Sequence, residues 1–239
     1  MSNTEARQVW VIGFPKSGNT WMSYLISYCL NIPFHNFGNP SEKPQKAWVS
    51  ELTSGKNSWA QFDGFDSVQK THKYPRQVPF HDGLVIYALR DPRDVFVSYH
   101  YFMSSSNARM MGRLRYYLLG VLGKQAQIKW FLAQWEKHLE AWLPHSEVVI
   151  SYDKLLADGP EYLAILLGKD PFDLDKGLVS QAYDQFSFEN MSGGRKAGSE
   201  DQKSFFRKGV SGDWENHFSE EEATLFSGAI KVYENAIRP

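Results

Sequence analysis

The segment that says most about the architecture is Gly13-Phe14-Pro15-Lys16-Ser17-Gly18-Asn19-Thr20. A short apolar run, Val9–Ile12, comes directly before it, and Thr20–Leu30 follows it with apolar residues at helical spacing. We therefore predict a buried strand, a glycine-rich loop and a helix, the opening of an α/β nucleotide-binding unit. Backbone N–H groups in a glycine turn at a helix N-terminus cradle phosphate, and the helix dipole strengthens the attraction.

This loop departs from the ATP-binding pattern G-x-x-x-x-G-K-[ST] at one position. Gly13 and Gly18 have the required spacing, and Thr20 offers a hydroxyl that could hold Mg²⁺. However, Asn19 stands where the lysine belongs, and the lysine lies inside the loop as Lys16. The displaced lysine argues against a kinase or an ATPase. A glycine and serine turn that binds no ligand is the structural alternative.

Further along the chain, strands and helices alternate. Val68–Thr71, Leu84–Leu89 and Val148–Ile150 are strand candidates, whereas Ile128, Phe131, Trp135, Leu139 and Trp142 recur at the spacing of an amphipathic helix. Residues 34–66 are predicted to form loops and short helices. This order favours a central, mostly parallel sheet with helices on both faces. Without a Pro/Gly-rich linker, we expect residues 1–239 to form a single domain.

Composition excludes several classes of protein. The 239 residues carry 26 Lys+Arg against 27 Asp+Glu and are 42% hydrophobic, so a disordered chain and a wholly basic nucleic-acid binder are excluded. The single cysteine, Cys29, favours a reducing compartment, and no apolar run approaches the ~20 residues of a membrane span. The seven histidines show no metal-ligand spacing. We expect a cytoplasmic protein that binds neither metal nor nucleic acid and does not insert stably into membranes.

Three segments resemble one family, in the expected order. Phe14–Trp21 resembles the 5′-phosphosulfate loop of the cytosolic-type sulfotransferases, which use 3′-phosphoadenosine 5′-phosphosulfate (PAPS). Arg90–Tyr99 resembles the 3′-phosphate motif of that family, and Phe206–Trp214 resembles its Arg-Lys-Gly loop. Weaker matches are Lys70-Thr71-His72, Ser151-Tyr152-Asp153 and Phe186-Ser187-Phe188. The resemblance spans residues 9 to about 226.

The resemblance implies a PAPS-dependent sulfotransferase without metal, which moves a sulfuryl group to a hydroxyl or amine and releases adenosine 3′,5′-bisphosphate. By analogy with phosphoryl transfer, catalysis would rest on positioning and on charge stabilisation at the leaving phosphate, the role implied for Lys16. His72 resembles the catalytic base, and Lys70 would assist at the sulfuryl oxygens. A surface or capping role is the alternative for His72, and the other histidines are interpreted as structural.

The resemblance also implies a set of cofactor contacts. The loop would offer Lys16, Ser17, Gly18, Asn19 and Thr20 to the 5′-phosphosulfate. Trp21 and Phe188 would sandwich adenine, with Tyr152 and Ser187 as polar contacts. The 3′-phosphate would be held by Arg90, Ser98, Arg207, Lys208 and Gly209. Ordinary helix packing is the alternative for Trp21. We interpret Arg93 and Asp94 as surface ion-pair residues.

Residues 34–66 and 104–127 would correspond to the loops that shape the acceptor pocket. Arg109, Arg113, Arg115 and Lys124 lie among Met110, Met111, Leu114, Leu118, Val121 and Leu122 in the second segment. A mobile lid, a basic membrane-surface helix and an ordinary solvated helix remain open for it. The aromatics Phe62, Phe65, Tyr74, Tyr101 and Phe102 suggest a partly apolar pocket for a small hydroxylated molecule, although they could equally be core.

The expected acceptor is a small molecule, whose identity the sequence does not give. The Lys-Thr-Val-Glu dimer motif of the family is absent from its expected place, so we expect a monomer or weak dimer. Two other functions remain open. A small-molecule kinase would need Mg²⁺ and a nucleoside triphosphate, and a non-catalytic nucleotide-binding protein would bind the bisphosphate without turnover.

Overall fold

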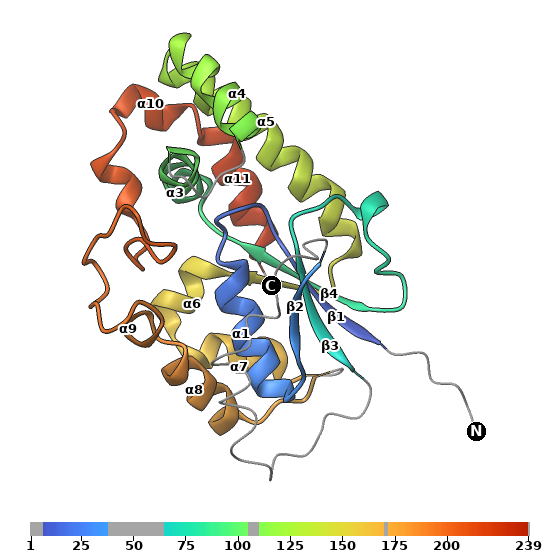
Figure 1. Cartoon of the computed structure of the whole chain (residues 1–239). Helices are drawn as coiled ribbons and strands as arrows, with labels where there is room; N and C mark the ends of the chain where they lie inside the picture. Colours follow the sequence, from blue (N-terminus) through green and yellow to red (C-terminus); the bar gives the residue numbers. More distant parts are fainter. Residues whose placement is uncertain (1–6, 38–64, 105–109, 170–171, 239) are drawn as a thin grey trace.

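The centre of the protein is a five-stranded sheet in which every neighbouring pair is parallel. The computed structural model describes residues 7–37, 65–104, 110–169 and 172–238 (Figure 1). The strands are β1 (Gln8–Ile12), β2 (Phe34–Asn36), β3 (Ser67–Thr71), β4 (Leu84–Leu89) and β5 (Val148–Ser151), in the order β2-β3-β1-β4-β5. The predicted parallel α/β architecture is therefore confirmed.

Alternating residues of the strands supply two separate cores. Val9 and Val11 of β1 point into a core shared with α1 (Asn19–Leu30), α6 (Tyr152–Asp158), α7 (Pro160–Leu167) and α8 (Lys176–Gln185). Trp10 and Ile12 point to the opposite face, toward α3 (Pro92–Ser104), α5 (Lys124–Trp142) and α11 (Ser227–Ala236). Because side chains alternate across a strand, a continuous apolar run in a parallel sheet requires cover on both faces. Figure 1 shows these helices on the two sides of the sheet.

The connections that leave β1 and β4 define the edge of the sheet where a ligand would bind. β1 and β4 are neighbours, but the chain goes from β1 to α1 on one face and from β4 to α3 on the other. In open parallel sheets, this divergence at the carboxyl ends leaves a crevice at the sheet edge. The glycine-rich loop after β1 and Arg90 after β4 both lie there.

Two predicted loop segments contain regular structure. Phe34–Asn36 is the edge strand β2, and residues 104–127 include α4 (Met110–Val121) and the start of α5. Residues 38–64 and 105–109 lie outside the described residues, and the expectations for Phe62 and Arg109 lie there with them. The remaining elements are α9 (Phe188–Met191), α10 (Glu220–Thr224) and the 3₁₀ turns Pro75–Gln77, Leu143–His145 and Asp213–Asn216. None of the helices within the described ranges is long and apolar enough to cross a bilayer.

Candidate active site

The glycine-rich loop turns sharply from β1 into α1. Gly18 caps the helix with φ +90°, and Lys16 also has a left-handed backbone with φ +77°. A Cβ at residue 13 would lie 2.5 Å from the Ala88 carbonyl oxygen, so the loop packs against β4 only because glycine stands there. No side chain caps the first turn of α1, which leaves its backbone N–H groups to meet an anion.

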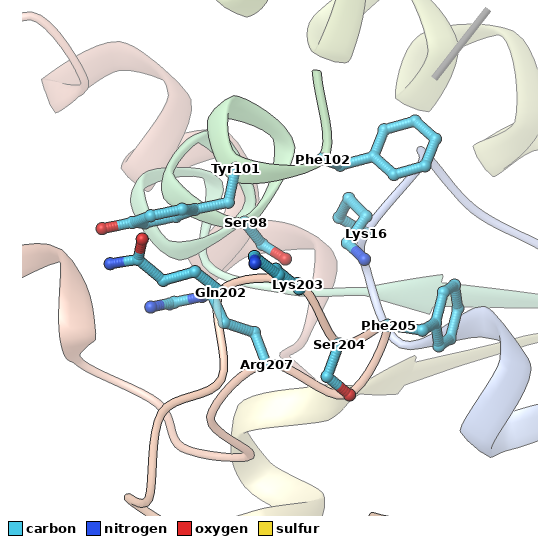
Figure 2. Close-up of a pocket in the computed structure, with 9 residues that line it drawn as sticks. All are labelled: Lys16, Ser98, Tyr101, Phe102, Gln202, Lys203, Ser204, Phe205 and Arg207. Atoms are coloured by element: carbon cyan, nitrogen blue, oxygen red, sulfur yellow. The ribbon is translucent and has the colours of Figure 1, made fainter. Parts of the chain in front are cut away.

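Lys16 extends into a small hollow that is open to solvent. Its ammonium lies 4.5 Å from the ring centre of Phe205 and 5.5 Å from that of Phe102, and Figure 2 shows it between the two rings. The pKa of Lys16 is lowered from 10.5 to about 8, mainly by burial and then by the nearby positive charges of Arg90, Arg207 and Lys70, in that order. Four cationic side chains are therefore gathered close together, and an anionic ligand bound among them would reduce their mutual repulsion.

His72 hydrogen-bonds to the same loop. Its Nδ1 lies 2.8 Å from the carbonyl oxygen of Gly13, which also accepts a 3.0 Å bond from Asn19 Nδ2. Since a carbonyl can only accept, Nδ1 carries the proton and the Nε2 lone pair of a neutral ring is available as a base.

The surroundings of His72 favour this neutral ring. Loss of water around the imidazole lowers the pKa of His72 from 6.5 to about 4, with Lys70 as the next cause, while the Gly13 bond acts in the opposite direction. The residue as a whole is nevertheless exposed, so water reaches it and screens the lysine charges. The lowered pKa leaves the imidazole neutral at pH 7.

Lys70 reaches the start of α1 from the neighbouring strand β3. Its Nζ donates a 2.9 Å hydrogen bond to Thr20 Oγ1. Because β3 lies beside β1, Lys70 and His72 follow the sheet to the same edge as Lys16. The three predicted catalytic side chains therefore surround one end of the glycine-rich loop.

Arg90 is buried at the end of β4 and joins three segments. Its Nη2 donates to the Val210 carbonyl oxygen at 2.9 Å, and its guanidinium lies 4.4 Å from the ring centre of Tyr152. Arg90 Nε has no hydrogen-bond partner within the described structure, and the same is true of the buried atoms Ser17 Oγ and Asn19 Oδ1. Buried polar atoms without partners are costly, so these three point to a polar ligand.

The interpretation of Asp94 as a surface ion-pair residue is wrong. Asp94 is 1% exposed and accepts backbone hydrogen bonds from Gly212 at 2.6 Å and Trp214 at 3.0 Å. Arg93 instead pairs with Asp91 at 2.6 Å and stacks on the Trp214 ring. Asp94 thus anchors the loop that follows the Arg-Lys-Gly segment.

Asp213 holds both cations of that segment. Its carboxylate bonds Arg207 at 2.5 Å and also Lys208, while His217 lies 3.2 Å away. Burial alone would raise the pKa of Asp213, but the bonds from Lys208 and Arg207 hold it well below its usual range. Glu200 binds the other side of Arg207 at 2.5 Å. The two predicted 3′-phosphate cations are therefore positioned before any ligand arrives.

The predicted adenine contacts lie on the α1 side of the sheet. Trp21 meets Tyr152 edge-on, with ring centres 5.5 Å apart, and the ring of Phe188 lies directly against Gly209. The hydroxyl of Ser187 caps α9 by accepting from Asn190 N, so it is already engaged. Phe65 packs in the core, whereas Tyr101 and Phe102 line the hollow with Ser98 (Figure 2).

Sequence reasoning missed several residues of this site. Gln202, Lys203, Ser204 and Phe205 line the hollow from the loop before Arg207. Arg195 secures that loop, with bonds at 3.0 Å to the carbonyl oxygens of Ser199 and Arg207. Only the proximity of Phe205 to Arg207 in sequence could have indicated these residues, since Arg195 lies in no recognisable motif. In residues 7–37, 65–104, 110–169 and 172–238, no cluster of three or more His, Cys, Asp or Glu side chains could hold a metal ion.

Together, the parallel sheet, the glycine-rich loop and the surrounding cations define an α/β protein with a cationic crevice at the carboxyl edge of its sheet. Residues 6–234 match the family model described as the sulfotransferase domain. The chain therefore belongs to the sulfotransferase domain family, and the predicted resemblance is confirmed.

Relatives and solved structures agree with this assignment. The chain is 29% identical to 3-beta-hydroxysteroid sulfotransferase of Cavia porcellus, covering 93% of this chain and 81% of that protein. It is 25% identical to sulfotransferase 2A1 of Homo sapiens, in a match that covers 90% of this chain and 80% of that protein. Mouse sulfotransferase SULT7A1 complexed with PAP shares the fold at a TM-score of 0.61 and 17% identity, over 97% of this chain and 85% of that one. Retinol dehydratase in complex with androsterone and inactive cofactor PAP matches with a TM-score of 0.58 and 18% identity. The match covers 97% of this chain and 82% of that one.

Proposed function

We propose that this protein transfers the sulfuryl group of PAPS to a hydroxyl or amine of a small-molecule acceptor. The observation that carries the proposal is the gathering of Lys16, Lys70, Arg90 and Arg207 around a helix N-terminus at the crevice of a parallel sheet. A PAP-bound neighbour of the same fold adds support. Bound PAPS would supply the sulfuryl group and a phosphate leaving group.

The residues of the loop suit the reacting end of that donor. Lys16 would hold positive charge beside the oxygen that joins sulfur to the leaving phosphate, where charge develops during transfer. The N–H groups of α1 and the Ser17 hydroxyl would bind the phosphate oxygens. Lys70 would assist from the Thr20 side.

His72 would accept the proton of the acceptor at Nε2. Its Nδ1–H is held by Gly13, which fixes the ring and leaves the other nitrogen free. At the opposite end of the donor, the 3′-phosphate would be held by Arg90, Ser98, Arg207, Lys208 and the Gly209 backbone. Adenine would lie near Trp21, Tyr152 and Phe188, with stacking worth roughly 1–3 kcal/mol by analogy with nucleic-acid bases.

Titration calorimetry tests the donor assignment. Adenosine 3′,5′-bisphosphate should bind far more tightly than AMP or ADP, because only it carries the 3′-phosphate. Lys16→Ala should weaken binding, whereas Lys137→Ala, at an exposed position on α5, should leave it unchanged. Equal affinities for all three nucleotides would overturn the assignment.

Turnover is tested with radiolabelled PAPS and a library of hydroxylated and amine acceptors. Transfer that persists in EDTA supports the proposal. ATP turnover lost in EDTA would instead indicate a kinase, and bisphosphate binding without transfer to any acceptor would indicate a non-catalytic module.

A further inference from the structure

Helix α4 presents an unusual concentration of exposed apolar side chains. The described residues include ten large apolar side chains that are exposed, and seven of them belong to α4 or the residue after it. Met110 is 80% exposed and Val121 is 82% exposed, at the two ends of the helix. The others are Met111, Leu114, Tyr117, Leu118 and Leu122. Scattered exposed apolar residues are normal, but a contiguous group of this kind marks an interaction site.

The helix is amphipathic in an arrangement typical of a lipid interface. At 3.6 residues per turn, the seven side chains occupy an arc of about 140°, and Arg113 and Arg115 lie on its two borders. The opposite side contains Tyr116, which is buried against Met103 of α3. Long basic side chains at the borders of an apolar arc can extend to lipid headgroups while their stems remain in the apolar layer.

Charge around α4 also favours an anionic surface. No Asp or Glu occurs between residues 95 and 135, a segment that contains five Lys and Arg. Within the described residues, two carboxylates of α10 contact the start of α5, where Glu222 is paired with Lys124 and Glu221 bonds Gln125. The two arginines that flank the apolar arc therefore have no acidic neighbours in the segment.

We propose that α4 docks the protein onto the surface of an anionic lipid bilayer. A membrane is a better partner than a folded protein because α4 lies at the periphery of the molecule (Figure 1) and its exposed, flexible Met and Leu side chains can sink into a deformable layer. The helix lies next to the site, since Phe102 both lines the hollow and packs on the Met103–Tyr116 pair. Docking would hold the hollow near the membrane, so that acceptors dissolved in it could enter, a consequence that rests on the proposed function.

Vesicle flotation with the full chain tests the docking step independently of catalysis. The protein should float with vesicles of phosphatidylcholine and phosphatidylglycerol in equal parts, and much less with pure phosphatidylcholine. Leu114→Glu/Leu118→Glu should reduce the bound fraction roughly tenfold or more, because each change places a carboxylate in the apolar arc. Ile165→Glu, at an equally exposed isoleucine on α7, is the matched control and should float like the wild type.

Charge and assembly are tested in the same experiment. Arg113→Gln/Arg115→Gln should abolish the preference for phosphatidylglycerol. Thermal melting and bisphosphate binding are measured on every variant. A variant that keeps both properties is folded, so its loss of flotation cannot be attributed to unfolding. Flotation that Leu114→Glu/Leu118→Glu leaves unchanged would overturn the proposal. Failure of the wild-type chain to float with the anionic vesicles would also overturn it. A dimer that dissociates in Leu114→Glu/Leu118→Glu would then show that α4 binds a second copy instead. Loss of sulfuryl transfer with normal flotation would contradict only the proposed function.

Discussion

Lys16 and His72 must have opposite protonation states at the same pH, and their surroundings allow this. The lowered pKa of His72 leaves a neutral base at pH 7, while Lys16, with a pKa of about 8, remains mostly protonated. We predict that kcat/KM rises as pH passes through a His72 pKa below the ordinary 6.5, and falls as pH rises through about 8. In Lys16→Arg, the fall should disappear, because arginine stays charged. A basic limb that persists in Lys16→Arg would show that another group causes it.

The role of His72 predicts a separation of chemistry from binding. His72→Ala should lower kcat about 10²–10⁴-fold, the usual contribution of a positioned base, while bisphosphate affinity stays nearly intact. The ring contacts the loop at the Gly13 carbonyl and, at 3.4 Å, at Asn19 Nδ2, neither of which is a cation, so its removal should leave the cations in place. His81→Ala, at an exposed residue before β4, should change neither quantity. If His72→Ala weakens the nucleotide affinity and spares kcat, the histidine is a binding residue.

Asp213 is predicted to act through the two cations it positions. Asp213→Asn keeps the shape of the side chain but removes the charge that holds Arg207 and Lys208. Loss of such bonds costs about 1–3 kcal/mol, so the affinity for adenosine 3′,5′-bisphosphate should fall roughly 5- to 150-fold. AMP affinity should change little, because AMP lacks the 3′-phosphate. Asp91→Asn, which removes the carboxylate charge paired with Arg93 and leaves the Asp213 contacts in place, is the control. Tighter bisphosphate binding in Asp213→Asn would mean that the carboxylate repels the ligand more than it positions the cations.

At the scale of elements, the loop after Phe206 is held at a fixed distance from α9. Gly209 has φ +68°, and a Cβ there would overlap the ring of Phe188. We predict that Gly209→Ala displaces the loop and weakens bisphosphate binding at least as much as Asp213→Asn. Gly194→Ala is the matched control, since Gly194 also has a positive φ of +92° but no atoms near its Cβ position. Calorimetry with adenosine 3′,5′-bisphosphate measures both variants. A Gly194→Ala variant that is equally impaired would assign the effect to backbone strain instead.

Local patterns explain which elements could be predicted from the sequence. β1, β4 and α1 were predicted within about one residue, because fully buried strands read as apolar runs and Gly18 marks the start of the helix. β2 was missed because three residues at a sheet edge, Phe34–Asn36, carry no periodic signal. In the site, Lys16 and Arg90 could be predicted for the same reason, because each lies next to one of these elements. The role of Asp94 was not predictable, because its partner Gly212 lies 118 residues away and their contact exists only in the fold.

At the scale of the whole molecule, the site joins segments that pack on opposite faces of the sheet. Lys16 and Trp21 adjoin the α1 face, Ser98 belongs to α3 on the other face, and Arg207 comes from a loop near the C-terminus. Arg90 and Asp94 connect these parts through Val210 and Gly212. A ligand that bridges the cations would therefore be expected to stabilise both layers together, because it binds only when all of them are in place.

This linkage predicts a large thermal shift. At a concentration 100 times its Kd, a ligand that binds only the folded state adds about 2.7 kcal/mol to the free energy of unfolding. For a chain of this size, each kcal/mol raises Tm by about 2–4 °C, so adenosine 3′,5′-bisphosphate should raise Tm by roughly 5–11 °C. The same concentration of AMP should give a much smaller shift, and Arg207→Ala should remove most of the difference between the two nucleotides. Scanning fluorimetry measures these shifts directly. A bisphosphate shift that Arg207→Ala leaves intact would place the 3′-phosphate elsewhere, outside the group of cations held by Asp213.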